Sequence, residues 1–459
     1  MLKIRANHSN SISRMLVAAS IAAALLAGVS FTEAFNQEAR AESEIIFRFV
    51  KPQESRPNYS VPEDVGIANI PVTRSGGIDG KGNLDSEAFV DYTVAPGSCG
   101  PAQEAGNAEP GRDYIAVRGT LRFAPGETTK TFPVRIIDNN YAIGFATVFL
   151  TLKDSKTGLC TNSSDFAELL IIDNDSPPPN PNPIDEARFF VREQYYDFLN
   201  RAPDDPGLEH WTQEITQCSD ATKRRAGESL EQCIDRKRAN TAAAFFLSPE
   251  FQYTGYFIYR LYKGSFVGAP NYDGGSPGRF PPHTEFAEDS QQVAEGIVVN
   301  NQLSVERIEA NRAAFVARFV QREQFKAVYD SLNNAQYVDR LFAITTIVPT
   351  AAERQALIDG LNNTTESRAT VLRKVVDGTR VLAEGQVEFQ TRYGKAFYDQ
   401  EFNRAFVYME YSGYLQRDPD APGFNHWLAK LNFYGNFVDA EMVRSFLLSP
   451  EYRSRFGQQ

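Results

Sequence analysis

The stretch FLNRAPDDPGLEHW, residues 198–211, returns as YLQRDPDAPGFNHW at residues 414–427. A second signature, Leu-Ser-Pro-Glu followed by an aromatic residue, comes after each copy at 247–251 and 448–452. Paired motifs in the same order indicate a structural unit that is used twice. The positions that define this repeat signature are Arg201, Asp204, Gly207, His210 and Trp211 in the first copy, and Arg417, Asp420, Gly423, His426 and Trp427 in the second.

Each copy has the residue order of a joint between two helices. The aspartate is suited to cap the second helix, and the proline two positions later falls in its first turn, where a missing N–H costs nothing. Ser248-Pro249 and Ser449-Pro450 repeat this order and predict two further helix starts. We expect the tryptophans to fill the core between paired helices. The adjacent histidines are expected to make hydrogen bonds within the joint rather than to hold a ligand.

Apolar residues at helical spacing begin directly after residue 184, for example Phe189, Phe190, Tyr196 and Leu199. This pattern predicts an all-α domain over 184–459, with repeats near 189–263 and 400–459 and a degenerate one near 319–376. The Gly- and Pro-rich residues 264–283 are expected to form a surface loop with a solvated His283.

Residues 44–176 carry a different pattern, short segments in which apolar and polar residues alternate. Such segments predict an antiparallel β-sandwich. The expected strands are 66–74, 86–94, 119–123, 129–138, 147–152 and 166–173. Five prolines in the eight residues 176–183 predict an extended linker, at 177–183, that holds the two domains apart. The chain is therefore expected to be multidomain, an all-β sandwich followed by an all-α helical-repeat domain.

The N-terminus has the features of an export signal over residues 1–41. A basic segment with Lys3, Arg5 and Arg14 precedes an apolar run that is short for a bilayer span. An uncleaved membrane anchor is the alternative, and no transmembrane span is expected in the mature chain. The net charge of −11, with no basic run, argues against a nucleic-acid partner.

Export makes the four cysteines candidates for disulfides. Three pairings are possible from the sequence. The two pairings that stay within one domain, Cys99–Cys160 and Cys218–Cys233, are favoured, and the second would close a short loop.

Four motifs in the first domain resemble those of the Calx-beta family: residues 70–76 (IPVTRSG), 111–114 (GRDY), 119–127 (GTLRFAPGE) and 171–175 (IIDND). The resemblance implies an immunoglobulin-like sandwich with calcium held by carboxylates at one end. The positions that match the family's ligands are Glu63, Asp113, Asp138, Asn139, Asp173 and Asp175.

Three positions depart from that family pattern. Asn139 replaces an aspartate, and Ile143 and Ala146 stand where acidic residues are usual. Fewer carboxylates lower the affinity for calcium. Two interpretations therefore stay open: the remaining acids bind calcium weakly, or they only cap turns and solvate loops.

The second domain resembles a bacterial extracytoplasmic helical domain of unknown function that is distantly similar to phycobilisome linkers. The motif that carries this resemblance is Leu-x-Arg-x-Pro-Asp-x-x-Gly followed by Trp, at 199–211 and 415–427. The family has no settled activity, so the resemblance implies a fold and a location outside the cytoplasm.

The sequence contains no HExxH, nucleophile elbow, P-loop or GxGxxG motif. The prediction is a non-enzymatic secreted or cell-surface interaction protein, with possible weak calcium binding and an envelope or extracellular protein or polysaccharide as partner. The alternative is an enzyme that acts on an extracellular polymer, or the accessory subunit of one.

Overall fold

The computed structural model describes residues 45–52, 58–76, 84, 86–94, 108–154, 166–176, 181–273, 277–297, 302–381 and 387–457. The expected export signal and the expected Cys99–Cys160 pair lie outside these residues.

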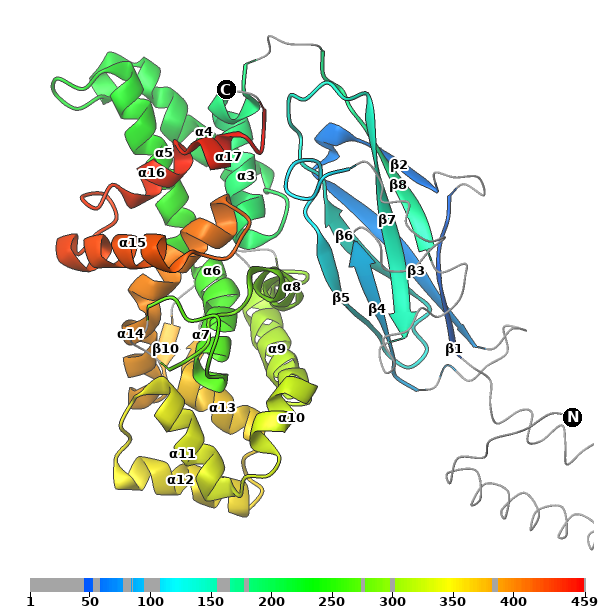
Figure 1. Ribbon diagram of the computed structural model, residues 1–459, viewed down its shortest axis with the longest axis vertical. Helices are drawn as coiled ribbons and strands as arrows, with labels where there is room; N and C mark the ends of the chain where they lie inside the picture. The colour runs from blue at the N-terminus through cyan, green and yellow to red at the C-terminus, as the bar shows by residue number, and fades with distance from the viewer. Residues whose placement is uncertain are drawn as a thin grey trace, which may run out of the picture.

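The first part of the chain is a sandwich of two sheets (Figure 1). One sheet has the antiparallel order β1-β3-β6, and the other has the order β2-β8-β7-β4-β5, in which β2 and β8 run parallel. The strands are β1 (Ile45–Phe49), β2 (Tyr59–Pro62), β3 (Ile67–Gly76), β4 (Ala88–Val94), β5 (Val117–Phe123), β6 (Thr129–Arg135), β7 (Phe145–Asp154) and β8 (Phe166–Ile172). This confirms the immunoglobulin-like sandwich.

Strict alternation explains why these segments pair as strands. Every second residue of β4, from Ala88 to Val94, is buried, and its inward face meets Val72 of β3 and Phe132 of β6 in one core. Tyr92 stacks on Phe132 with ring centroids 4.1 Å apart. All six expected strands are present. β1 (IIFRF) was missed because it opens with three consecutive apolar residues rather than an alternation, and β2 (YSVP) because it has only four residues and ends in proline.

The second part is helical, as predicted. Its helices are α3 (Ala187–Leu199), α4 (Asp205–Thr216), α5 (Leu230–Leu247), α6 (Pro249–Tyr253), α7 (Gly255–Ser265), α8 (His283–Ala294), α9 (Gln302–Phe319), α10 (Glu323–Tyr329), α11 (Asn334–Thr345), α12 (Ala351–Asn362), α13 (Arg368–Val376), α14 (Arg392–Met409), α15 (Ala421–Tyr434), α16 (Met442–Leu447) and α17 (Pro450–Arg453). A two-stranded ribbon, β9 (Thr379–Val381) with β10 (Val387–Phe389), precedes α14. A π-helical turn, Glu410–Tyr414, extends α14.

The capping prediction for the joints is confirmed. Asp204 accepts a hydrogen bond from the Gly207 amide at 3.1 Å, and Asp420 accepts one from the Gly423 amide at 2.8 Å. Ser248 and Ser449 cap α6 and α17 in the same way. The two copies also meet in the core, where the rings of the equivalent residues Phe198 and Tyr414 pack edge to face at 5.3 Å.

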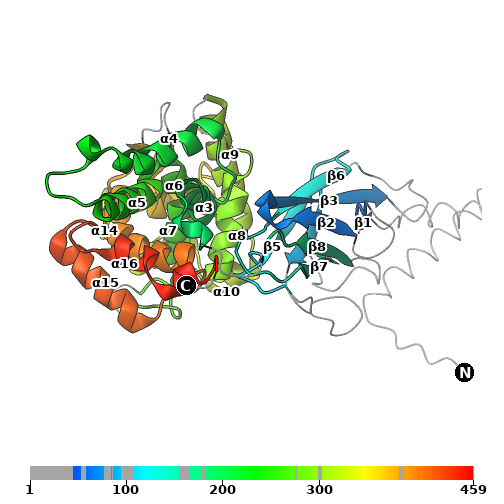
Figure 2. The same cartoon turned by 90° about the horizontal axis from the view of Figure 1, so that it is seen from above.

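The sandwich and the helices are in direct contact, so the expectation that the linker holds them apart is wrong (Figure 2). Arg135 at the end of β6 pairs with both Asp197 and Glu193 of α3, at 2.8 and 2.5 Å. Arg118 of β5 pairs with Glu288 of α8 at 2.5 Å. These ion pairs join the two parts, with Arg135, Asp197 and Glu193 largely buried and Arg118 exposed.

The C-terminal residues complete the contact. The Asn140 backbone amide donates to the carbonyl of Phe456 at 3.0 Å, and the Tyr141 hydroxyl donates to the carbonyl of Ser454 at 3.1 Å. Asn182, directly before α3, donates to the carbonyl of Arg453 at 3.0 Å. The last described turn, which we call the clasped C-terminal turn, is therefore hydrogen-bonded both to the sandwich and to the start of the helical part.

The predicted disulfide Cys218–Cys233 is present and joins the segment after α4 to α5 (the α4–α5 disulfide). The expectation for His283 is wrong. It is the first residue of α8, its Nδ1 lies 2.9 Å from the Ser412 hydroxyl, and burial lowers its pKa to about 4, assisted by Arg455. Among the described helices, none is both long and apolar enough to cross a membrane.

Candidate functional site

Three of the expected calcium ligands come together at one end of the sandwich. Glu63 opens a short 3₁₀ turn directly after β2, and Asp173 and Asp175 follow the end of β8, the strand that pairs with β2. One carboxylate oxygen from each of the three lies within 4.8 Å of the others. Strand pairing therefore places an acidic turn and an acidic strand exit side by side.

Glu63 is the innermost member of this three-carboxylate cluster, with 2% of its surface exposed. Its Oε1 accepts a hydrogen bond from the Asn139 side-chain amide, while its Oε2 is buried and has no partner in the described part of the chain. An unpartnered buried carboxylate oxygen is costly unless a cation or a proton satisfies it.

Asp173 is held in place by backbone amides. One oxygen accepts from the amides of Ile143 and Gly144, the latter at 2.6 Å, and the other accepts from the Asp175 amide at 2.7 Å. Asp175 in turn has a buried Oδ2 without a partner among the described residues. Two of the three carboxylates in the cluster thus have a buried oxygen without a partner among the described residues.

The electrostatics of the cluster agree with this geometry. Burial raises the pKa of Glu63 to about 8, with further contributions from the negative charges of Asp175, Asp173 and Asp138. Burial, together with Asp173 and Asp138, raises the pKa of Asp175 to about 6. The fold thus crowds acidic groups together, so that either a proton or a bound cation is needed to offset their repulsion.

Two further candidates, Asp113 and Asp138, have other partners. Arg112 forms a bidentate pair with Asp113 at 2.8 Å for both contacts, and Asp113 also accepts from the Glu109 amide. Asp138 pairs at 3.0 Å with Arg192, which belongs to α3 of the helical part. The pairing of Arg192 with Asp138 could not be predicted from the sequence, because it arises from the docking of the two parts.

The departures from the family pattern also have structural outcomes. The side chain of Ile143 is 41% exposed, and this residue serves the cluster through its backbone amide, which donates to Asp173. Asn139 is buried and supports Glu63 through its amide group, while its carbonyl oxygen accepts from the Tyr141 amide at 2.8 Å. Side-chain oxygens at this end are therefore fewer than in the family pattern.

The repeat signature is explained as construction of the joints. The repeated arginine makes a bidentate pair with the glutamate of the Ser-Pro-Glu signature: Arg201 with Glu250 at 2.6 and 2.9 Å, and Arg417 with Glu451 at 2.5 and 3.1 Å. This pairing was not foreseen, although the co-occurrence of the two signatures was a usable signal.

The glycine of the signature is required for close packing, whereas the histidine is exposed. A Cβ on Gly207 would lie 2.0 Å from the Tyr195 hydroxyl, so the position needs glycine for space, and Gly423 has the same relation to Tyr411. The expectation that the histidines bond within the joint is wrong. His210 is exposed, and its ring lies edge to face on Trp211 at 5.0 Å, as His426 does on Trp427. The tryptophans are half-buried against Phe245 and Phe446.

Comparison with known families finds one match in each part of the chain, and the second covers only the C-terminal portion of the helical part. A Calx-beta domain model matches residues 43–175, and a model for a domain of unknown function (DUF4214) matches residues 385–456. These matches agree with the two resemblances seen in the sequence. Neither family is catalytic.

Curated relatives match the sandwich. Sodium/calcium exchanger 1 of Bos taurus is 29% identical over 134 residues, which are 26% of this chain and 12% of the exchanger. Sodium/calcium exchanger 3 of Homo sapiens is 34% identical over 83 residues, 18% of this chain and 7% of the exchanger. The alignments thus span a small fraction of each exchanger's length. Among solved structures, the apo-form Calx CBD1 domain is matched over its full length and over 29% of this chain, at 23% identity and a TM-score of 0.23.

Proposed function

We propose that the chain is a non-enzymatic extracellular interaction protein whose sandwich binds one calcium ion through Glu63, Asp173 and Asp175. The observation that carries this proposal is the buried Oε2 of Glu63, which has no partner among the described residues and belongs to the three-carboxylate cluster. The match to the Calx-beta family, and the similarity of the sandwich to a segment of the sodium/calcium exchangers, support the choice of calcium among cations.

The oxygen donors of the cluster suit a hard cation that is bound with low affinity. Calcium takes six to eight oxygen ligands at about 2.3–2.6 Å, and three carboxylates supply three to six of them, leaving the remainder to water and backbone oxygens. Asp138 and Asn139 lie at the edge of the cluster, where Asp138 adds negative charge while it pairs with Arg192. Such a set belongs with extracellular modules, whose dissociation constants are about 0.1–1 mM.

A calcium titration tests this site with a matched pair of variants. Glu63→Gln keeps the shape of the side chain and removes its charge, while Asp64→Asn makes the same type of change at the exposed neighbour. We expect the melting temperature of the wild type and of Asp64→Asn to rise between about 0.1 and 10 mM calcium. Glu63→Gln should show no rise. A wild type that does not respond, or a Glu63→Gln that responds equally, would refute the site.

A location outside the cytoplasm is part of the proposal. The expected export signal and the α4–α5 disulfide support it, because disulfides persist in oxidising compartments. We further propose the domain limits 44–176 and 184–459 and the degenerate repeat near 319–376. No observation supports the enzyme hypothesis as directly as the carboxylate cluster supports the binding hypothesis.

A further inference from the structure

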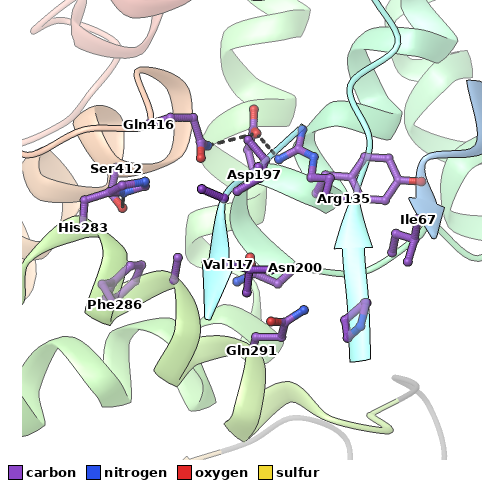
Figure 3. Close-up of a pocket in the computed structure, with 15 residues that line it drawn as sticks. Ile67, Val117, Arg135, Asp197, Asn200, His283, Phe286, Gln291, Ser412 and Gln416 are labelled. Atoms are coloured by element: carbon purple, nitrogen blue, oxygen red, sulfur yellow. Dashed lines mark hydrogen bonds and ion pairs between the residues drawn. The ribbon is translucent and has the colours of Figure 1, made fainter. Parts of the chain in front are cut away.

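A groove runs between the sandwich and the helical part, separate from the carboxylate cluster. Its volume is about 510 Å³, within the usual range for ligand sites, and its walls come from β3, β4, β5 and β6 on one side and from α3 and α8 on the other. At one end the groove adjoins an inner cavity of about 60 Å³ (Figure 3). The groove and the inner cavity share the lining residues Ile67, Pro133, Tyr196, Asn200 and Gln291.

The two joints of the repeat both contribute to the inner cavity. Asn200 and Gln416 occupy equivalent positions, each directly before the signature arginine, and each adopts a left-handed backbone conformation with φ of 52° and 53°. For Asn200 this conformation is the left-handed C-cap of α3, which asparagine adopts more readily than most residues. The pseudo-symmetric joints thus direct two amide side chains toward one cavity, with Gln291 of α8 as a third (Figure 3).

Most polar groups of this lining are neutral, and several are unused. In the described part of the chain no hydrogen bond involves the side-chain amide of Asn200, Gln291 or Asn69, the last of which lies in the outer groove. The charged residues of the inner cavity, Arg135 and Asp197, are paired with each other at 2.8 Å. Of the charged residues in the outer groove, Arg201 is paired with Glu250, and Glu295 is exposed to solvent at the rim.

The sandwich contributes mainly apolar groups to the inner cavity. Ile67, Ile115, Val117 and Pro133 line it together with the paired Arg135, and Phe286 of α8 lines it as well. In the outer groove the hydroxyl-bearing Thr131 and Tyr92 line the sandwich side. Apolar C–H surface together with free amide and hydroxyl groups is the complement of a neutral sugar, which has an apolar ring face and a rim of hydroxyls.

We propose that this groove binds a neutral oligosaccharide. The outer groove holds the sugar rings, and the inner cavity, too small for a ring, takes one exocyclic substituent such as a hydroxymethyl or acetamido group. A peptide strand fits less well. The neighbouring edge strand β6 contains Pro133, which has no N–H to donate, and α8 already lies against the β5 edge.

Calorimetry on the full chain, in calcium-free buffer, tests the proposal independently of the metal site. The probes are the neutral hexasaccharides of cellulose, starch, xylan and chitin, the acidic hexamer of galacturonic acid, and a random peptide mixture. We expect at least one neutral hexasaccharide to bind with a dissociation constant below about 1 mM. Asn200→Gly/Gln291→Ala, which keeps the left-handed backbone and removes two amides, should weaken binding at least about tenfold.

Gln355→Ala on the remote, exposed surface of α12 is the control and should bind as the wild type does. Should the double variant fail to fold, Thr131→Trp gives the same information, because Thr131 is exposed and a large ring there fills the groove from its rim. No binding of any neutral probe, binding of the acidic hexamer or the peptides alone, or full binding by Thr131→Trp would each overturn the proposal.

Discussion

The raised pKa of Glu63 predicts how the free energy of unfolding depends on pH. Without calcium, the folded protein keeps this carboxyl protonated up to about pH 8, whereas the unfolded chain ionises it near its ordinary value of 4.5. Between these limits the folded state holds more protons than the unfolded state, so the free energy of unfolding falls as pH rises. The difference between the two pKa values sets an upper bound of about 5 kcal/mol on the loss.

Because the cluster lies at the end of the sandwich, where water and loop movement can screen the charge, we expect roughly half of that bound, about 2–3 kcal/mol between pH 5 and pH 9. Calcium should reverse the sign. A bound divalent cation favours the ionised carboxylates, so calcium stabilises more at pH 8 than at pH 6, and its binding releases protons.

Urea unfolding from pH 5 to pH 9, with chelator or with saturating calcium, measures both slopes. Other groups titrate in the same window, since burial also raises the pKa of Glu288 to about 8. The informative quantity is therefore the difference between the wild type and Glu63→Gln, which lacks the titrating group. In chelator, Glu63→Gln should be the more stable protein at pH 8 and nearly equal to the wild type at pH 5. Parallel pH curves for the two proteins would refute the reasoning.

Three further predictions concern the helical part. Glu250→Ala should cost about 3 kcal/mol, because it removes the bidentate partner of the largely buried Arg201 and leaves only Asp204, at 3.3 Å, as a carboxylate partner among the described residues, whereas Glu451→Ala, the same change in the exposed second copy, should cost less than about 1 kcal/mol in urea unfolding. Gly207→Ala should lower the melting temperature through the clash of its Cβ with the Tyr195 hydroxyl, and adding Tyr195→Phe should recover part of the loss. Reduction of the α4–α5 disulfide should cost about 3 kcal/mol, measured by calorimetry with and without reductant.

The sequence predicted features that depend on local chemistry. The cap of Asp204 and the strand alternation of β4 are determined by residues a few positions apart, and Cys218 and Cys233, which close a short loop, are separated by 15 positions. The family pattern added Glu63 and Asp173, which are far apart in sequence but meet because β2 pairs with β8.

Features that depend on docking between the two parts were not predictable. Nothing local to Asp138 indicates that Arg192 will neutralise it, and nothing in the residues before His283 indicates that Ser412 will meet its imidazole. The proline-rich segment even argued for separation. Pairings over this distance follow from the relative placement of whole domains, on which single-sequence patterns carry no information.

The clasped C-terminal turn has a consequence for biosynthesis. Tyr141 and its partner Ser454 are 313 residues apart, and Asn182 and its partner Arg453 are 271 residues apart. A chain made from its N-terminus contains the whole sandwich sequence long before these partners exist, so a sandwich that folds before synthesis is complete folds with this surface uncovered. A chaperone or a transient self-association would meet that surface first, and a nascent chain cut short before residue 453 would keep it exposed.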